Sequence, residues 1–116
     1  MKDALAGLTL LITEDYKLTE TVRLAHIILP GADPYEKEGT FTNDRGRVQR
    51  VRRTIDPPGT AKPDWEIITL IGSTLQADSF PFGKPSEIML EIAEELPTYN
   101  GMNYENLGML GADRSQ

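Results

Sequence analysis

Two short apolar runs near the start of the chain constrain its fold more than any other feature. They are Leu8–Thr13 (LTLLIT) and Ala25–Leu29 (AHIIL). Continuous apolar runs of about four to eight residues are typical of strands buried on both faces, as in parallel sheets. The segment between them, Leu18–Ala25 (LTETVRLA), predicts a short helix. Strand, helix and strand form a compact βαβ unit, so we expect an α/β fold that begins with a partial Rossmann-like parallel sheet.

A sheet of two parallel strands is not a stable domain by itself. Both of its edges present unpaired backbone groups, and strands of the buried type would face water. The length of 116 residues corresponds to about one small domain. We therefore expect a single partial domain that belongs to a larger α/β body and is only marginally stable when isolated.

A β-hairpin with a local concentration of arginine is predicted next. Segments Thr40–Thr42 and Val48–Val51 are β-prone, and Asn43–Gly46 between them is a four-residue turn signal. Five of the twelve basic residues lie here: Arg45, Arg47, Arg50, Arg52 and Arg53. Two interpretations stay open: a solvated edge hairpin whose charges discourage aggregation, or a strip that docks on an acidic partner surface. A net charge of -6 disfavours nucleic acid as the partner, because phosphate contacts call for a basic excess.

The second half of the chain is predicted to be mainly helical. Asp64 is a predicted N-cap for a helix that runs to about Gln76, and Ser86 for one that runs to about Leu96. Apolar stripes support both helices: Trp65, Ile68, Ile71 and Leu75 in the first, and Ile88, Ile92 and Leu96 in the second. One further helical turn is predicted at Asn103–Leu107, so two or three helices follow the hairpin. We expect a βαβ unit with its hairpin at residues 1–53 and a loop at 54–63. A helical segment is expected at 64–111 and a fraying tail at 112–116.

Several residue types and motifs are missing from the sequence. The chain has no cysteine, which excludes disulfides, thiolate metal sites and an iron–sulfur cluster held by this chain. That composition fits a reducing cytoplasm, and we expect a cytoplasmic protein that reaches a membrane only through a complex. No run approaches the roughly 20 apolar residues of a membrane helix, and the start lacks the cleavage pattern of a signal peptide. The lone histidine, His26, is expected to be structural, and no motif assigns a catalytic or metal-binding residue.

The candidates for ligand binding are charged residues near a predicted strand end. Glu14 and Asp15 follow the first apolar run, and open α/β sheets bind ligands outside the carboxyl ends of their strands. These acids would accept hydrogen bonds from ribose or a purine edge, or they would cap the following helix; both hypotheses stay open. Lys37, between two glutamates, is either an ion-pair residue or a cation directed at phosphate. Asp64 is by default a helix cap.

Two long segments resemble the large molybdopterin oxidoreductases, which include formate dehydrogenases, periplasmic nitrate reductases and the large iron–sulfur subunit of NADH–quinone oxidoreductase. The segments are LTETVRLAHIILPGADPYEKEGTFTNDRGRVQRV and DPPGTAKPDWEIITLIG. The positions that match the family pattern are Asp15, Thr19, Thr21, Ala25 to Pro30, Glu36 to Thr40, Asn43, Arg47, Gln49 and Pro58 to Trp65. The resemblance runs from about Leu8 to Gly111, almost the whole chain.

The resemblance implies a section of the large α/β body that holds a molybdopterin guanine dinucleotide. In that family, cofactor contacts fall at the strand-end pair, at the lysine of Glu-Lys-x-Gly and at the aspartate before the tryptophan. By motif these contacts map onto Glu14, Asp15, Lys37 and Asp64, and Thr19 matches in formate-dehydrogenase-like members. The family is one of oxidoreductases active in electron transfer, but this chain alone is expected to carry no catalysis. Its expected partners are the remainder of the large subunit or other subunits of a complex.

The chain also departs from the family pattern. His26 stands where aspartate is usual, and Thr60 where glutamate is common. The family's iron–sulfur cysteines, its metal-ligating residue and its C-terminal barrel are absent. In the NADH–quinone oxidoreductase branch the pterin fold persists as a scaffold, often without the metal, so the motifs alone do not establish a bound cofactor. That branch and the formate dehydrogenase branch fit equally well, and a free-standing interaction module that uses the arginine-rich hairpin is the alternative of another class.

Overall fold

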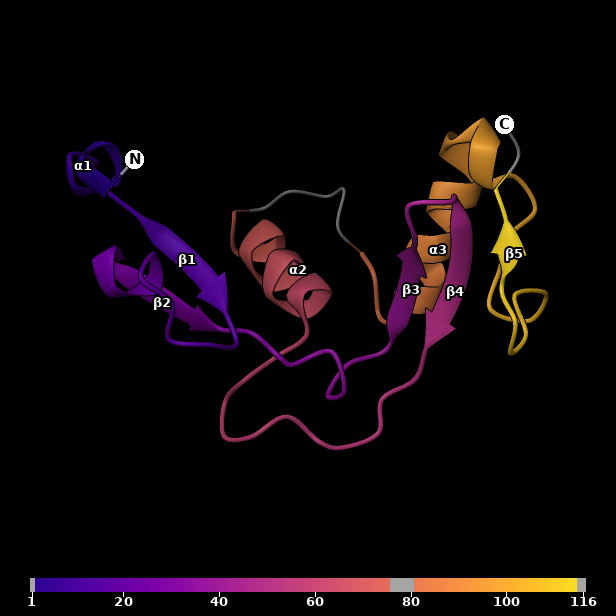
Figure 1. The fold of residues 1–116 in the computed structure, drawn as a ribbon, viewed down its shortest axis with the longest axis horizontal. Helices are drawn as coiled ribbons and strands as arrows, with labels where there is room; N and C mark the ends of the chain where they lie inside the picture. The colour runs from indigo at the N-terminus through magenta and orange to yellow at the C-terminus, as the bar shows by residue number, and fades with distance from the viewer. Residues whose placement is uncertain (1, 76–80, 115–116) are drawn as a thin grey trace.

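A computed structural model of the chain describes residues 2–75 and 81–114, and Figure 1 shows their arrangement. The elements in chain order are α1 (Lys2–Ala6), β1 (Ile12–Asp15), a 3₁₀ turn η1 (Val22–Leu24), β2 (Ile27–Pro30), β3 (Gly39–Thr42), β4 (Arg47–Val51), α2 (Asp64–Thr74), α3 (Pro85–Glu95), η2 (Pro97–Tyr99) and β5 (Ala112–Asp113). The pair β1–β2 lies at one end of the molecule, the strands β3, β4 and β5 with α3 at the other, and α2 between them. The predicted α/β class, with a parallel pair, a hairpin and helices, is confirmed.

The parallel pair forms where it was predicted, but its first strand is shifted. β1 pairs with β2 from Ile12 opposite Ile27 to Asp15 opposite Pro30, so the strand begins at Ile12 instead of Leu8. The helix predicted over Leu18–Ala25 is wrong and shrinks to the single turn η1. The hydroxyl of Thr19 accepts a hydrogen bond from the Val22 amide at 3.3 Å, and such local side-chain bonds compete with helix formation.

The hairpin has the predicted strands and the predicted four-residue loop. β3 and β4 pair antiparallel, with Gly39 opposite Val51 and Thr42 opposite Val48. The side-chain oxygen of Asn43 accepts hydrogen bonds from the amides of Arg45 and Arg47, each at 3.0 Å. This loop geometry explains why the turn signal was readable from four residues alone.

The C-terminal segment does not fray at residues 112 and 113, contrary to prediction. It forms β5, in which Ala112 lies opposite Val48 and Asp113 opposite Arg47. Gly111, at φ 75°, enters this strand so close to the Val48 carbonyl that a side chain would collide with it. The pairing was missed because it joins residues far apart in the sequence, and two residues carry no strand pattern.

Both longer helices are present, but their caps and their buried faces differ from the prediction. Pro63 is the N-cap of α2 and Lys84 that of α3, without side-chain cap hydrogen bonds, so Asp64 and Ser86 are not N-caps. The predicted end at Gln76 lies outside the described residues. In α2 the buried residues are Ile67 and Gly72, whereas three members of the predicted stripe are exposed: Ile68, Ile71 and Leu75.

The main cluster of buried residues lies at the hairpin end of the molecule, while Val22, Ala32 and Ile67 are buried outside it. The cluster consists of Val48, Met89, Met102 and Leu107, with Tyr99, Tyr104 and Ala112 packed against it. At the other end, Ile12, Ile27 and Ile28 of the parallel pair are 48%, 46% and 48% exposed. The strands with the buried type of sequence are therefore the ones that face water in this chain, as the pattern predicted.

Candidate functional site

The site begins with a junction that brings three distant segments to the strand ends. Gly31 donates its amide to the Asp15 carbonyl at 3.1 Å, directly after β2. Gly31 also forms a parallel bridge with Lys62: the Ala32 amide binds the Lys62 carbonyl at 2.8 Å, and the Lys62 amide binds that of Pro30 at 3.1 Å. The loop that enters α2 therefore runs beside the end of β2, which carries Asp64 to the end of β1.

Three of the five predicted site residues meet at this junction. The ammonium of Lys37, from the loop before β3, forms an ion pair with Asp64 at the start of α2. The Lys37 side chain is only 19% exposed, and that of Asp64 is 52% exposed. Glu14, at the end of β1, shares a hydrogen bond with Asp64, and its Oε1 is buried without a partner among the described residues. We call these residues the charged triad.

The two carboxyl groups of the charged triad have pKa values shifted in opposite directions. Burial, followed by the hydrogen bond and the negative charge of Asp64, raises the pKa of Glu14 from 4.5 to about 7, although the Lys37 charge opposes the shift. Burial alone would raise the pKa of Asp64 too. Hydrogen bonds from Lys37 and Glu14 and the charge of Lys37 outweigh it and hold that pKa below its ordinary value of 3.8. Near neutral pH, Glu14 is thus partly protonated beside an ionised Asp64 that neutralises Lys37.

The other two predicted residues, Asp15 and Thr19, form a separate pair. Successive residues of a strand point to opposite faces, so Asp15 lies away from the charged triad. Its Oδ1 accepts a hydrogen bond from the Lys17 amide at 3.0 Å, and its Oδ2 accepts one from the Thr19 hydroxyl at 3.1 Å. The predicted helix that Asp15 would cap is absent, and Asp15 instead orders the turn after β1. Ligand binding by Asp15 stays a prediction and would use its remaining acceptor capacity.

Asp15 also lines a cleft of about 490 Å³ at the carboxyl ends of β1 and β2, which we call the strand-end cleft. Its lining comprises Asp15, Tyr16, Lys17, Pro30, Gly31, Asp33, Glu36, Ile55, Pro58, Thr60 and Ala61. The backbone amide of Asp33 binds the Glu36 carboxylate at 2.8 Å, so a tight turn holds these two acids in place. Sequence reasoning missed Lys17, although its position two residues beyond a strand end was a readable signal.

Lys37 and Asp64 open instead on a neighbouring apolar groove of about 440 Å³. Side chains from β3, β4, α2 and α3 line it, including Phe41, Val51, Trp65, Ile68, Ile88 and Ile92. Of the five predicted residues, Lys37 and Asp64 thus line the apolar groove and Asp15 lines the strand-end cleft, while Glu14 and Thr19 contact them from outside these linings.

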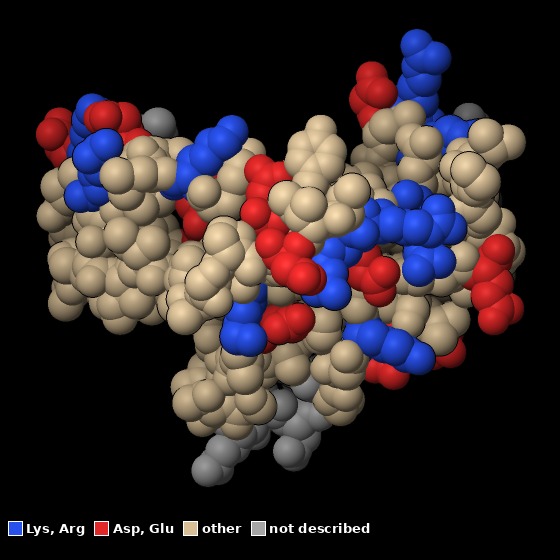
Figure 2. All heavy atoms as spheres, turned by 90° about the horizontal axis from the view of Figure 1, so that it is seen from below, with Lys and Arg blue, Asp and Glu red and all other residues tan. Residues whose placement is uncertain are grey.

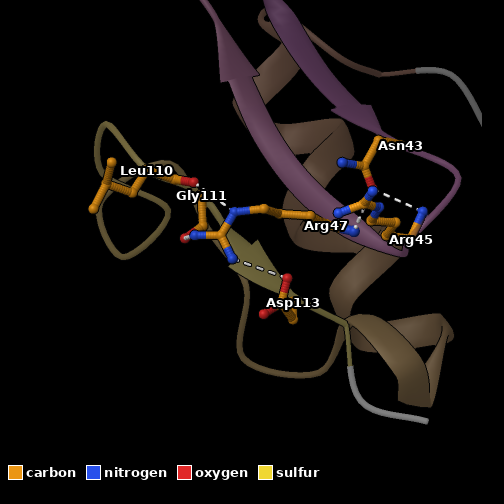
Figure 3. A network of polar contacts seen from close by, with 6 residues as sticks. All are labelled: Asn43, Arg45, Arg47, Leu110, Gly111 and Asp113. Carbon is orange, nitrogen blue, oxygen red and sulfur yellow. Dashed lines mark hydrogen bonds and ion pairs between the residues drawn. The ribbon is translucent and has the colours of Figure 1, made fainter.

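The arginines of the hairpin are used mainly inside the chain. Arg47 binds the carbonyls of Leu110 at 2.9 Å and Gly111 at 3.3 Å and pairs with Asp113 at 2.9 Å, which anchors β5 (Figure 3). Arg50 lies 4.3 Å from the centre of the Tyr104 ring and 3.7 Å from Glu38.

Three of the five arginines in the run therefore form ion pairs within the described part of the chain. Arg53 also pairs, with Asp56 at 3.5 Å. Basic and acidic side chains are interspersed on the face that Figure 2 shows, without a large patch of either sign.

His26, which was predicted to be structural, contacts the backbone of the segment before β1. Its Nδ1 accepts a hydrogen bond from the Leu11 amide at 2.9 Å, while its own amide binds the Leu11 carbonyl at 2.8 Å. Within residues 2–75 and 81–114, no group of three or more potential ligands gathers as a metal site. In the same residues, no helix has the length and apolar character needed to cross a bilayer.

Comparison with known proteins gives consistent matches. The model of the molybdopterin oxidoreductase family matches residues 1–73. The chain is 41% identical over 112 residues to the F420-dependent formate dehydrogenase 1 subunit alpha of Methanococcus maripaludis, covering 96% of this chain and 17% of that one. It is 44% identical over 107 residues to a putative formate dehydrogenase of Staphylococcus haemolyticus, covering 92% and 11%.

A solved structure supports the fold. Acetylene hydratase from Pelobacter acetylenicus superposes with a TM-score of 0.69 at 22% identity, covering 90% of this chain and 14% of that one. At this identity the likeness concerns the fold alone. The chain thus spans about a sixth or less of the length of the proteins it matches.

Proposed function

The chain belongs to the molybdopterin oxidoreductase family, and from this premise we propose that it forms one wall of a pterin guanine dinucleotide pocket. The pocket would be that of a formate-dehydrogenase-like large subunit engaged in electron transfer. The observation that carries the proposal is the gathering of Glu14, Lys37 and Asp64 at the junction where β1 and β2 end. All five predicted site residues, Thr19 included, are thereby assigned to cofactor binding.

The residues present match the chemical groups of such a cofactor. The family implies molybdopterin; the guanine dinucleotide form adds a pyrophosphate, ribose hydroxyls and the N–H donors of guanine. Asp15 offers free acceptor capacity to such donors at a strand end. The unpartnered Oε1 of Glu14 is a further acceptor, and Lys37 is a cation held close by. When bound, the cofactor supplies the redox chemistry, and the residues of this chain bind and orient it without a catalytic role.

The remaining surface favours a larger assembly as the partner. Large apolar side chains stay exposed on both β1–β2 and α2, among them Ile28, Leu70 and Leu75. We propose that the remainder of a large subunit covers them and that residues 1–116 are one partial domain of it. The relatives reported above are formate dehydrogenases, which favours that branch over NADH–quinone oxidoreductase. The interaction-module alternative loses support, because Arg47 and Arg50 are occupied within the chain.

The proposal is tested by the cofactor content of the chain purified from its host with any polypeptide that accompanies it. Pterin is measured by fluorescence after oxidative release, and guanine nucleotide by chromatography. We expect Asp15→Asn to lower the affinity for the cofactor about tenfold, because a hydrogen bond to a charged group contributes about 1.5–3 kcal/mol. Asp3→Asn, a change of an exposed acid in α1, serves as the matched control.

Two outcomes would contradict the proposal. One is a preparation that contains neither pterin nor guanine nucleotide although the companion polypeptide is present. The other is a cofactor content that stays unchanged in Asp15→Asn, Lys37→Gln and Asp64→Asn alike.

A further inference from the structure

Lys17 differs from four other cations that line clefts on the described surface. The others each form an ion pair with a carboxylate: Lys37 with Asp64, Lys62 with Glu66 at 3.4 Å, Arg53 with Asp56 at 3.5 Å and Lys84 with Glu87 at 3.9 Å. Lys17 lines the strand-end cleft and has no carboxylate partner among residues 2–75 and 81–114. Its charge is therefore available to a ligand without the loss of an ion pair.

Local contacts hold Lys17 in position. Its amide binds Asp15 Oδ1 at 3.0 Å, and its carbonyl accepts the Thr19 amide at 2.9 Å. Its ammonium lies 4.8 Å from the centre of the Tyr16 ring, a distance at which the ring face attracts a cation. Because the backbone is fixed on both sides, less freedom is lost when this ammonium binds an anion.

The acids of the cleft restrict which anion fits. Asp15, Asp33 and Glu36 line the same hollow, so three carboxylates face one lysine. A simple anion is repelled by this excess of negative charge. A ligand that binds must also bring hydrogen-bond donors for the carboxylates, and a nucleotide with a donor-rich base and ribose has both kinds of group.

We propose that Lys17 binds a phosphate of a guanine nucleotide in the strand-end cleft, while the carboxylates accept hydrogen bonds from its base and ribose. This assignment rests on the proposed function and adds a binding residue to it. It also separates two roles: Lys37 is a cation neutralised by Asp64 at the apolar groove, and Lys17 is the unpaired cation of the strand-end cleft.

The test compares three probes: guanosine, guanosine 5′-monophosphate, which adds a phosphate to it, and inorganic phosphate alone. Each is titrated calorimetrically into cofactor-stripped protein, purified as above with its companion polypeptide. We expect the monophosphate to bind about tenfold more tightly than guanosine, and inorganic phosphate alone to show no binding. Lys17→Gln should remove the difference between the first two probes, and Lys17→Arg should retain it.

The controls separate this proposal from the one on which it rests. Lys2→Gln changes an exposed lysine paired with Glu20 and should leave the affinities for guanosine and guanosine 5′-monophosphate unchanged. Suppose that Asp15→Asn weakens the binding of guanosine and of guanosine 5′-monophosphate, while Lys17→Gln leaves the ratio of these two affinities unchanged. The cleft then binds the nucleotide, but the assignment of Lys17 is wrong. If Lys37→Gln instead removes the difference in affinity between guanosine 5′-monophosphate and guanosine, Lys37 is the phosphate ligand and the assignment of Lys17 is wrong. If neither nucleoside nor nucleotide binds, both proposals fail.

Discussion

The two ends of this molecule have opposite relations to solvent. At the hairpin end, β4, α3 and the C-terminal segment enclose a core in which Val48 and Leu107 are each 1% exposed. At the other end, β1 and β2 have the more apolar sequence, yet their isoleucines are about half exposed. Apolar sequence and burial inside one chain are therefore separate properties. The strands that carry the candidate site are not buried by any part of the described chain.

The largest effect expected from this comparison is on unfolding free energy. Leu107→Ala should lower it by about 3 kcal/mol, because a fully enclosed leucine leaves a cavity when truncated. Ile28→Ala in β2 should lower it by about 1 kcal/mol or less, because that side chain is 48% exposed already. Urea denaturation of the chain, followed by circular dichroism, measures both values.

The same pair of variants tests whether the companion polypeptide covers the parallel strands. With the companion polypeptide present, the cost of Ile28→Ala should rise toward that of Leu107→Ala. Equal costs in the isolated chain would contradict the difference between the two ends.

A smaller effect is expected from the arginine that joins β4 to β5. Arg47→Ala removes hydrogen bonds to two carbonyls and an ion pair with Asp113, and should cost about 2 kcal/mol. Arg45→Ala, on the same hairpin but without an ion pair among the described residues, should cost about 0. Denaturation gives the two energies, and hydrogen exchange at the Ala112 amide reports whether β5 detaches. If the two variants cost the same, the contacts of Arg47 do not stabilise this end of the molecule.

The parts of the fold that sequence predicted are those set by neighbouring residues. The turn Asn43–Gly46 and the apolar runs of β1 and β2 carry their own signals. β5 and the exposed stripe of α2 were mispredicted because they depend on which distant surface each segment meets. The cap of α2 was mispredicted for a similar reason, because the Asp64 side chain pairs with the distant Lys37 and not with the amides at the start of its helix.

The candidate site follows the same division. A strand end and the family resemblance sufficed to select Glu14, Asp15, Thr19, Lys37 and Asp64 as candidates. Which of them meet depends on the pairing of Gly31 with Lys62, which joins two loops and leaves no periodic pattern in the sequence. Lys17 became a candidate only when the carboxylate partners of the other cations were known.

The smallest effect expected is the pH dependence that the charged triad gives to the site end. The folded chain raises the pKa of Glu14 from 4.5 to about 7, so ionising this carboxyl opposes folding. Its contribution to stability is complete below pH 4.5 and is lost as the pH rises to about 7. The lowered pKa of Asp64 acts in the opposite direction, and its contribution is lost as the pH falls below the ordinary value of 3.8.

The variant Glu14→Gln separates these two contributions, because glutamine resembles the protonated acid and does not titrate. We expect the variant and the original chain to be equally stable near pH 4.5 and the variant to be the more stable above pH 7. Glu20→Gln, a change of an exposed acid paired with Lys2, should show no such divergence. Denaturation curves from pH 4 to 8 measure the difference, and carboxyl ¹³C chemical shifts locate the titration directly. A Glu14 carboxyl that titrates near 4.5 would mean that Glu14 is neither buried nor in contact with Asp64 in solution, and it would then not belong to the charged triad.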